Sequence, residues 1–338
     1  MTVLITGGSG FVGINIIEKL LDDNINVLNY ATHPVPEEAV NSLESRNGNY
    51  VYIHGDVLDH ERLDFVIKQN EIKAIIHAAA ITPDFKREQL YSKTITNVNY
   101  MGTVEVLEAA RRNGVEKFVY LSSVSVYGDT AFEDDLLTES ETVPLPRTLY
   151  EISKYAAERT VLRYKALFGL HTFVVRLGQV FGPWEHYTGI RHTQSGPFQA
   201  TRHAVLGQEA RLPRPGLRDW VYSKDVAHSI HQILLKKELK YDLYNIGSGK
   251  SWTVEEWCQL LANEFPDFTY TMVEKEDEAN VDFFVPQDAH PLSIERLQSD
   301  VGYHPKYGME EAFHDYMHWI RNTSLFWTSE RENINRLS

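Results

Sequence analysis

The feature that most constrains the fold is a glycine-rich turn at the N-terminus. An apolar run at residues 3–5 breaks into Thr-Gly-Gly-Ser-Gly-Phe-Val-Gly at residues 6–13, and apolar residues at helical spacing follow. Gly7 permits a tight turn, Gly10 lets backbone N–H groups approach a pyrophosphate, and Gly13 lets helix and strand pack closely. A dinucleotide would then face the helix N-terminus. The residues predicted to bind it here are Gly7, Gly10, Phe11, Val12 and Gly13.

Strand and helix patterns alternate through the first half of the chain. Strands are predicted at residues 27–30, 51–53, 74–77, 118–121 and 172–176, and helices at 98–113 and 150–168. This alternation predicts an α/β fold with a Rossmann-type, doubly wound parallel sheet that binds a cofactor at the carboxyl ends of its strands. The expected cofactor domain spans 1–177 and is rejoined by about 220–248. A smaller, mixed α/β substrate-binding domain takes 178–219 and 249–338.

Several strand ends carry residues suited to a dinucleotide. Asp56, followed by Val57, could accept a hydrogen bond from an adenine amino group, and the small residues Ala78, Ala79 and Ala80 would let backbone lie against the ligand. Taken alone, an aspartate in such a place is more often a helix cap. Asn99 would by itself be a satisfied buried amide.

Tyr150 and Lys154 lie four residues apart in a helical pattern, which puts them on one face. A phenol with an ordinary pKa of about 10 is a poor base near neutrality, but a nearby ammonium favours the phenolate. Such a tyrosine can take a proton from a hydroxyl or give one to a carbonyl oxygen. An isolated pair of this kind is usually a packing residue and a solvated charge, so the surrounding motifs decide the interpretation.

Taken together, these motifs resemble those of the extended short-chain dehydrogenases/reductases, the NAD-dependent epimerase/dehydratase family. The order and spacing of the turn at 6–13, of 55–57, 77–80, Asn99 and 123–128, and of the Tyr150/Lys154 pair carry the resemblance. Later landmarks at 176–183, 218–227 and 244–249 extend it to roughly residue 320. The closest branch is that of the UDP-galactose 4-epimerases.

The resemblance implies a role for each matching residue. Ser123 would hydrogen-bond the reacting oxygen beside Tyr150, Lys154 would hold the nicotinamide ribose and lower the tyrosine pKa, and Asn99 would shape the hydrogen-bond network. A hydride would move between a carbinol carbon and the nicotinamide. The family also implies a homodimer, paired through the helices that contain 104–110 and 155–167.

Departures from the family narrow the reaction. The 4,6-dehydratases carry Asp-Glu after the active-site hydroxyl, whereas this chain has Val124 and Ser125, which cannot supply the acid and base for dehydration. The decarboxylating branch requires a glutamate at the position that Ser125 occupies, so decarboxylation is not expected either. The lone cysteine, Cys258, lies far from this serine. The reactions of the family that are not excluded are dehydrogenation, reduction, and epimerisation by oxidation and re-reduction.

The substrate residues point away from a nucleotide sugar. Gln179 replaces an asparagine of the nearest relatives, and the acidic stretch 274–282 lies where they carry a diphosphate-binding arginine. Repulsion by this stretch would disfavour a diphosphate, leaving Arg218, with Arg214 as a second candidate, to hold an anion. The loop at 183–197 adds His186, Arg191 and His192 as candidates for binding a carboxylate or sugar hydroxyls. No carboxylate–histidine spacing indicates a metal.

Composition agrees with a cytoplasmic enzyme. The 338 residues carry a net charge of −14, which argues against nucleic acid or an anionic membrane as partner. One cysteine suits a reducing compartment, and no signal peptide or membrane-spanning run is expected. The second strand ends near Ala31 with neither the acid that favours NAD nor an arginine that favours NADP, so the sequence leaves both open.

The sequence thus predicts an NAD- or NADP-dependent oxidoreductase that acts on a hydroxyl or carbonyl of a sugar-like, polyhydroxylated small molecule by Ser-Tyr-Lys chemistry. A UDP-sugar 4-epimerase with tightly bound NAD is the alternative. A non-catalytic dinucleotide-sensing protein ranks last, because such a protein would lose the Tyr/Lys pair.

Overall fold

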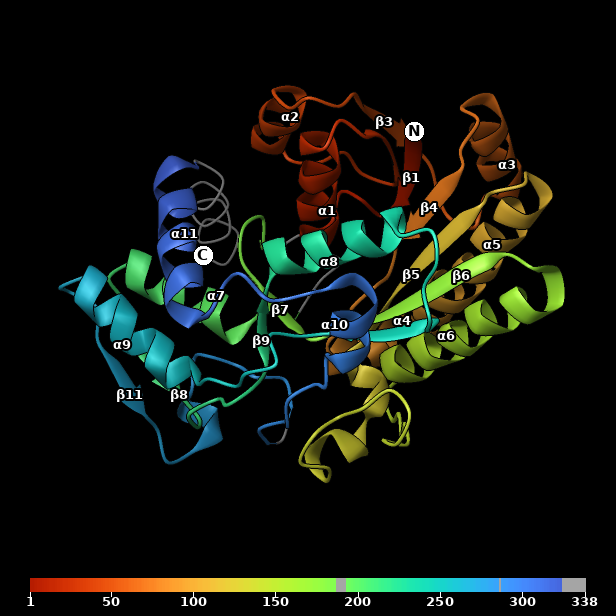
Figure 1. The fold of residues 1–338 in the computed structure, drawn as a ribbon. Helices are drawn as coiled ribbons and strands as arrows, with labels where there is room; N and C mark the ends of the chain where they lie inside the picture. The colour runs from red at the N-terminus through yellow and green to blue at the C-terminus, as the bar shows by residue number, and fades with distance from the viewer. Residues whose placement is uncertain (187–192, 286, 324–338) are drawn as a thin grey trace.

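A seven-stranded parallel sheet forms the centre of the computed structural model, which describes residues 1–186, 193–285 and 287–323 (Figure 1). The strand order is β10-β6-β5-β4-β1-β2-β3. The strands are β1 (Thr2–Thr6), β2 (Asn26–Ala31), β3 (Tyr50–His54), β4 (Ala74–His77), β5 (Lys117–Ser123), β6 (His171–Leu177) and β10 (Leu243–Ile246). Because the chain order reverses direction at β1, the crevice at the ends of β1 and β4 is where such sheets bind ligands.

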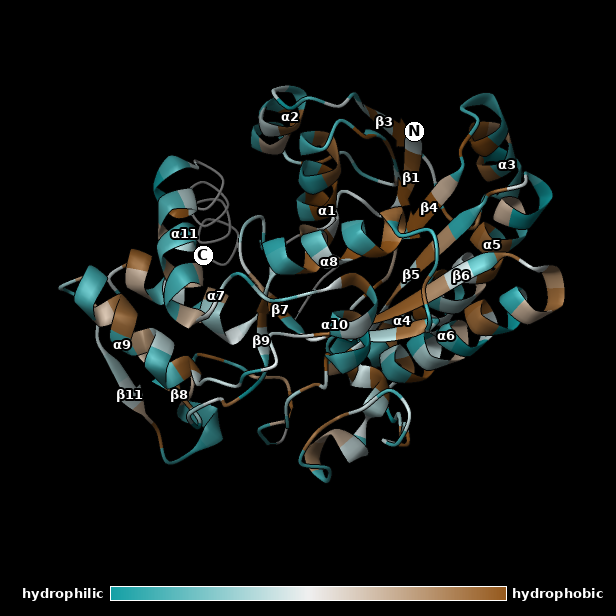
Figure 2. Cartoon of the chain, in the orientation of Figure 1, coloured by the Kyte–Doolittle hydropathy of each residue, from teal (hydrophilic) through white to brown (hydrophobic). Residues whose placement is uncertain are grey.

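Helices cover both faces of this sheet, as the sequence predicts. One face packs on α1 (Phe11–Asp22), α2 (Glu37–Glu44) and α8 (Ser223–Leu235). The other packs on α3 (His60–Gln69), α5 (Gly102–Arg112) and α6 (Leu149–Phe168). Successive residues of β1 alternate between the two cores, with Val3 and Ile5 in one and Leu4 in the other. Figure 2 shows the resulting apolar sheet between helices whose outer faces are polar.

The predicted helix at 98–113 differs at its start. α4 (Phe85–Thr96) runs into a π-helical turn, Asn97–Met101, before α5 begins at Gly102. This wider turn buries Asn99, which bonds the segment after β4. π-Turns inside helices are often found at functional sites.

A second group of elements lies to one side of the sheet and is called the second lobe here (Figure 1). It comprises α7 (Gly196–Val205), β8 (Ala210–Leu212), α9 (Val254–Glu264), β11 (Tyr270–Met272) and α11 (Met309–Asn322). β8 pairs with β11, and the short strands β7 (Gln179–Phe181) and β9 (Trp220–Tyr222) pair between the lobe and the sheet. Its core is aromatic, with Trp257 in contact with Trp252, Phe181 and Phe313. The assignment of cofactor and substrate domains to these parts stays a prediction.

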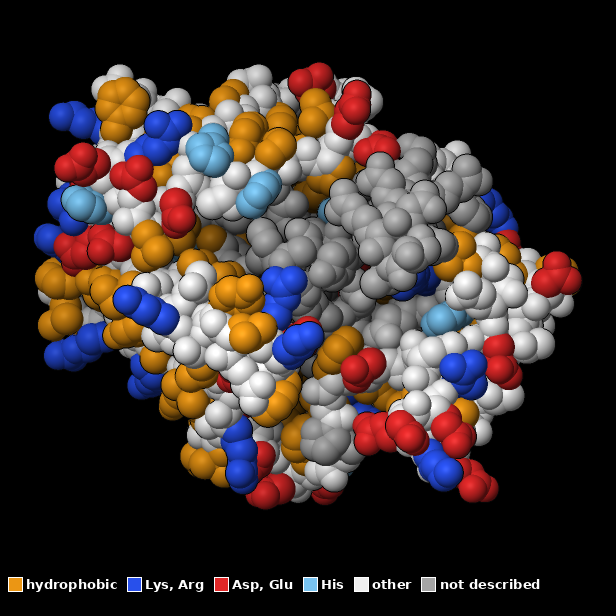
Figure 3. Space-filling model, turned by 180° about the vertical axis from the view of Figure 1, so that it is seen from behind, with side chains coloured by type: hydrophobic (Ala, Val, Ile, Leu, Met, Phe, Trp, Pro, Cys, Tyr) orange, Lys and Arg blue, Asp and Glu red, His pale blue; other side chains and the backbone are white. Residues whose placement is uncertain are grey.

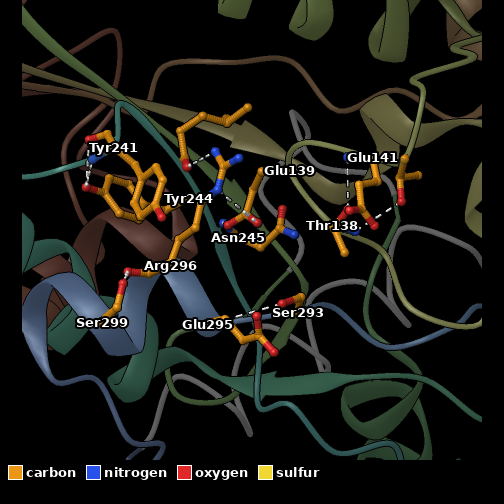
Figure 4. Close-up of polar contacts among 12 residues, drawn as sticks. Thr138, Glu139, Glu141, Tyr241, Tyr244, Asn245, Ser293, Glu295, Arg296 and Ser299 are labelled. Carbon is orange, nitrogen blue, oxygen red and sulfur yellow. Dashed lines mark hydrogen bonds and ion pairs between the residues drawn. The ribbon is translucent and has the colours of Figure 1, made fainter.

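The remaining elements are short: the 3₁₀ turns Val124–Tyr127, Asp129–Phe132 and Glu276–Glu278, and α10 (Glu295–Val301). Figure 4 shows how α10 joins the last strand of the sheet. Glu139 accepts a hydrogen bond from the Asn245 N–H in β10, with 2.8 Å between N and Oε1, and pairs with Arg296 of α10. The Asn245 side chain also accepts from the Tyr127 hydroxyl, 3.0 Å away, so Tyr127 anchors the loop after β5. No helix within the described residues has the length and apolar character needed to cross a bilayer.

Candidate active site

One large cavity opens at the carboxyl ends of the parallel strands, with a volume of about 1500 Å³. Pockets for a single small molecule are usually about 300–1,000 Å³. The glycine turn, the ends of β2 and β4, and the residues after β5 line it from the sheet. Residues 193–196, Arg218, Trp220 and 282–285 form its opposite side, called the far wall here. The cavity therefore has room for a dinucleotide and a second ligand.

The glycine turn is shaped as the sequence predicts. Gly7 has a φ of 67°, and a Cβ there would lie 2.5 Å from the Ala79 Cα, so only glycine fits. A Cβ on Gly13 would lie 2.6 Å from the Gly8 carbonyl oxygen, so the close contact of α1 at this position is with the turn rather than with the strand. Gly10 is the N-cap of α1 and lines the cavity, and a Cβ there would lie 3.4 Å from the Gly7 carbonyl oxygen, an ordinary contact distance. The turn therefore fits a pyrophosphate at the helix N-terminus.

The part of the cavity that is predicted to hold adenosine is formed where β2 and β3 end. Asp56 and Val57 line it, and the Asp56 carboxylate accepts from the Leu58 N–H at 2.9 Å, so the carboxylate also caps its own turn. Thr32 and His33 line the cavity without having been predicted, since nothing in their pattern distinguishes them from loop residues.

Some residues near the end of β4 line the cavity, and another holds the segment that follows them in place. Ala78, Ala79 and Ala80 line the cavity. Asn99 is 1 % exposed and is not part of the lining. Its side chain accepts from the Ile81 N–H at 2.7 Å and donates to the Ile81 carbonyl at 3.0 Å, which fixes the segment that follows the alanines. Direct contact between Asn99 and a cofactor stays a prediction.

Tyr150 and Lys154 both line the cavity from the first two turns of α6. The start of this helix is fixed by a capping box, in which the Thr148 hydroxyl accepts from the Glu151 N–H and the Glu151 carboxylate accepts from the Thr148 N–H. Glu88 of α4 accepts from the Leu149 N–H and ties α4 to the same helix end. The residue before Tyr150 is therefore held from a second element.

Lys154 is 3 % exposed, and its ammonium lies 4.6 Å from the centre of the Tyr120 ring. Burial lowers the pKa of this amine to about 7, although the nearby Glu158 raises it in part. Glu158 is itself paired with Arg176, with 2.6 Å between Oε1 and Nη2, and accepts from Ser122. The ammonium therefore lies in a low-dielectric site where its charge acts strongly on neighbouring groups.

Ser123 ends β5 and lines the cavity with Tyr150 and Lys154. Its hydroxyl accepts from the Ser125 N–H at 3.2 Å and lies 3.0 Å from the Ser125 hydroxyl. Ser125 lines the cavity as well, so two hydroxyls reach it from one turn. The structure thus brings together the three residues predicted for catalysis.

The predicted substrate residues are only in part within the described chain. Gln179, His186 and Arg218 line the cavity, whereas Arg191 and His192 lie outside the described residues. Gln179 faces Trp220 in the β7–β9 pair. The Arg218 backbone is held by hydrogen bonds in both directions with Trp252. Tertiary pairing, which sequence spacing does not reveal, adds Trp220 and residues 282–285 to this wall.

Arg218 presents a buried guanidinium to the cavity. It is 3 % exposed, its Nη2 donates to the Phe283 carbonyl at 3.1 Å, and its Nε has no hydrogen-bond acceptor within the described residues. Burial, with the nearby positive charge of Arg214, lowers the pKa of this guanidinium to about 10. A buried cation without a carboxylate partner is stabilised by an anionic ligand.

The structure differs from two of the sequence predictions about the far wall. Arg214 donates to the Asp288 carboxylate, with 2.9 Å between Nε and Oδ1, and does not line the cavity. The expectation that the acidic stretch 274–282 would repel an anion is wrong for most of it, because only Asp282 lines the cavity. The turn at Glu276–Glu278 is exposed, and Figure 3 shows acidic side chains gathered at the edge of the molecule on the side of β8 and β11.

Comparison with known proteins fits this geometry. A model of the NAD dependent epimerase/dehydratase family matches residues 3–247, which include the glycine turn and the Tyr150/Lys154 pair. The chain belongs to this family. It is an enzyme of the family's NAD-dependent class, and the resemblance found in the sequence is confirmed.

Relatives match along nearly the whole chain. A dTDP-D-glucose 4,6-dehydratase from Mus musculus is 27 % identical over 98 % of this chain and 92 % of its own. A putative UDP-glucose 4-epimerase from Methanocaldococcus jannaschii is 25 % identical over 95 % of this chain and 99 % of its own.

Solved structures share the fold. The UDP-glucose 4-epimerase of Thermotoga maritima with UDP-glucose has a TM-score of 0.79 at 23 % identity and covers 95 % of this chain and 99 % of its own. The dTDP-glucose 4,6-dehydratase of Bacillus anthracis in complex with NAD also has a TM-score of 0.79, at 24 % identity, over 97 % of this chain and 99 % of its own.

Proposed function

We propose that this enzyme transfers a hydride between NAD and a hydroxyl-bearing carbon of a sugar-like substrate that carries an anionic group. The observation that supports it best is the meeting of Ser123, Tyr150 and Lys154 in one cavity with the glycine turn. The family and its NAD-bound structural neighbour support NAD as the cofactor. The buried guanidinium of Arg218 supports an anionic substrate.

The proposed chemistry follows from the residue types. Bound NAD would supply the acceptor for the hydride that leaves the carbinol carbon. Tyr150, as phenolate, takes the proton of the hydroxyl while the C–H bond breaks, so the alcohol becomes a carbonyl. Lys154 favours the phenolate by its charge, and Ser123 donates to the substrate oxygen. In reduction, Tyr150 returns the proton to the oxygen.

Dehydration of the kind named in the relatives is not part of the proposal. Val124 and Ser125 follow Ser123, and neither side chain supplies an acid or base. Of these two, only Ser125 lines the cavity.

A UDP-sugar 4-epimerase is the second candidate. The cavity volume favours it, as does the structural similarity to an epimerase that holds UDP-glucose. Such an enzyme would use the same three residues, rotate its keto intermediate and retain NAD through purification.

Tyr150→Phe tests the shared chemistry. The purified protein is supplied with NAD and a panel of sugar acids, free sugars and UDP-sugars, and NADH formation or epimer formation is measured. The variant should bind NAD as the wild type does but lose turnover by a factor of about 10³ or more. Full activity in this variant would overturn the proposal.

We also propose a homodimer formed through α5 and α6. Its support is the exposed apolar surface of α6 and its neighbours, which includes Ile152, Leu167, Phe168 and Leu90. Sedimentation of the purified protein tests it: a dimer that Ile152→Lys dissociates supports the proposal, and a monomeric wild type contradicts it.

A further inference from the structure

One buried aromatic side chain of the far wall separates the cavity from the core of the second lobe. Phe283 lines the cavity, is 5 % exposed and belongs to the aromatic core of the second lobe. No residue from 197 to 217 lines the cavity, although all of them are described. On this side, Phe283 therefore lies between the cavity and the core of the second lobe.

Two glycines make room for this ring. A Cβ on Gly216 would lie 2.5 Å from the Phe283 Cζ, and a Cβ on Gly196 would lie 3.0 Å from its Cε1. The ring thus occupies the space between the start of α7 and the loop before Arg218. Because it is packed against backbone on both sides, it cannot swing aside without disturbing either segment.

The backbone around Phe283 is also fixed. Its carbonyl accepts from Arg218, and the Asp282 carboxylate accepts from the Phe284 N–H at 2.6 Å. Phe284 has a φ of 58°, a conformation that is costly for a bulky residue and is found where strain serves a site. The ring and the anion-binding guanidinium are therefore parts of one fixed unit.

The charge of the far wall matches a short anion. Among its described residues, Arg218 is the only cationic side chain, and Asp282 adds a negative charge. The nearby Arg214 guanidinium lies 4.9 Å from the Phe283 ring but is paired with Asp288. Lys86 and Arg87 also line the cavity, but on the side of α4. On the far wall, one cation suits one carboxylate better than a diphosphate, which would bring more negative charge against Asp282.

We infer that Phe283 limits the length of the substrate, so that the enzyme takes a sugar acid whose carboxylate ends at Arg218 and excludes a nucleotide. This inference rests on the proposed function, since it assumes that the reacting hydroxyl lies at Ser123 and Tyr150. It names the substrate class of that site and separates it from the UDP-sugar alternative.

Calorimetric titration of the NAD-loaded protein with UDP tests the inference. The wild type should show no binding of UDP up to about 1 mM, whereas Phe283→Ala should bind UDP at least about tenfold more tightly. Phe283→Leu keeps more of the core and should show a smaller gain, so it decides the outcome where the alanine variant does not fold. Phe268→Leu is the matched control, because Phe268 is equally buried in the same core but does not line the cavity.

Titrations of the NADH-loaded protein with D-gluconate and L-threonate, which cannot be oxidised by the reduced cofactor, complete the design. For each sugar acid, the dissociation constants of the wild type and of Phe283→Leu should agree within about threefold. Arg218→Met should bind each sugar acid at least about tenfold more weakly. Tight UDP binding by the wild type, no gain in either Phe283 variant, or an equal gain in Phe268→Leu would each overturn the inference. None of these readouts involves hydride transfer, so its failure is distinguishable from failure of the Tyr150→Phe test.

Discussion

The Lys154 ammonium donates to the Leu121 carbonyl at the end of β5, with 2.5 Å between Nζ and O. This bond joins the helix that carries Tyr150 to the strand that leads to Ser123. The charge of the Lys154 ammonium is only partly balanced, because the neighbouring Glu158 is already paired with Arg176. Burial of this amine therefore lowers the stability of the protein without cofactor.

The first prediction concerns the pH dependence of that cost. Burial lowers the Lys154 pKa from 10.5 to about 7, so between these values the unfolded chain holds a proton that the folded protein has released. The free energy of unfolding should therefore rise with pH in this window, by up to about 1.4 kcal/mol per pH unit. Lys154→Met lacks this contribution.

Urea unfolding of the cofactor-free proteins measures the difference. From about pH 7 to about pH 9 the wild type should gain roughly 2 kcal/mol relative to Lys154→Met. Parallel stability curves for the two proteins across this range would show that burial does not lower the pKa of Lys154.

The second prediction separates two hydroxyls of one turn. If Ser123 donates to the reacting oxygen, Ser123→Ala should lower kcat by about 10²-fold with a much smaller change in KM. Ser125→Ala is the matched control and should lower kcat by less than about tenfold. Steady-state NADH formation with the best substrate of the panel measures both, and a larger loss in the Ser125 variant would exchange the two roles.

Much of the fold could be predicted because its signals are local. Buried parallel strands read as short apolar runs, and the spacing of Gly7, Gly10 and Gly13 reflects contacts within a single turn. Tyr150 and Lys154 are one helical turn apart, so their common face follows from spacing alone. These features need no knowledge of distant segments.

The far wall could not be predicted for the opposite reason. Phe283 meets Arg218 and Gly216 only through tertiary packing, and it lies 65 positions after Arg218 in the chain. The order of the sequence predicts that the acidic stretch before it lies at the anion site, but the turn at Glu276–Glu278 is exposed and does not line the cavity. The π-helical turn at Asn97–Met101 has no distinct apolar period, so its sequence predicts an ordinary helix.

The third prediction concerns His77, which ends β4 and links two threonines. Its Nδ1 lies 2.6 Å from the Thr6 hydroxyl and its Nε2 lies 2.9 Å from that of Thr103. Burial, with the charge of Lys154, lowers the pKa of this imidazole to about 3, so it stays neutral in the folded protein. Below about pH 6.5 the unfolded chain binds a proton that the folded protein does not, and stability should fall as the pH falls.

His77→Gln tests this account. Between about pH 6.5 and about pH 4.5 the wild type should lose roughly 2 kcal/mol of unfolding free energy relative to the variant. The exposed His60 provides the control, and His60→Gln should leave the pH profile unchanged. Equal acid sensitivity of the wild type and His77→Gln contradicts the prediction.

The last prediction compares two glycines of the same backbone conformation. Gly7 and Gly114 have φ values of 67° and 65°, so an alanine at either pays about 1–2 kcal/mol for the left-handed region. A Cβ on Gly114 meets nothing within 4 Å, whereas one on Gly7 meets the backbone of Ala79. Gly7→Ala should therefore lower the free energy of unfolding in urea by a further 1–3 kcal/mol or so.

Gly7→Ala should also weaken NAD binding at least about tenfold, because Ala79 and the turn both line the cavity, while Gly114→Ala should bind NAD normally. Equal losses in the two variants would mean that backbone conformation, not the close approach of β1 and β4, requires glycine at position 7.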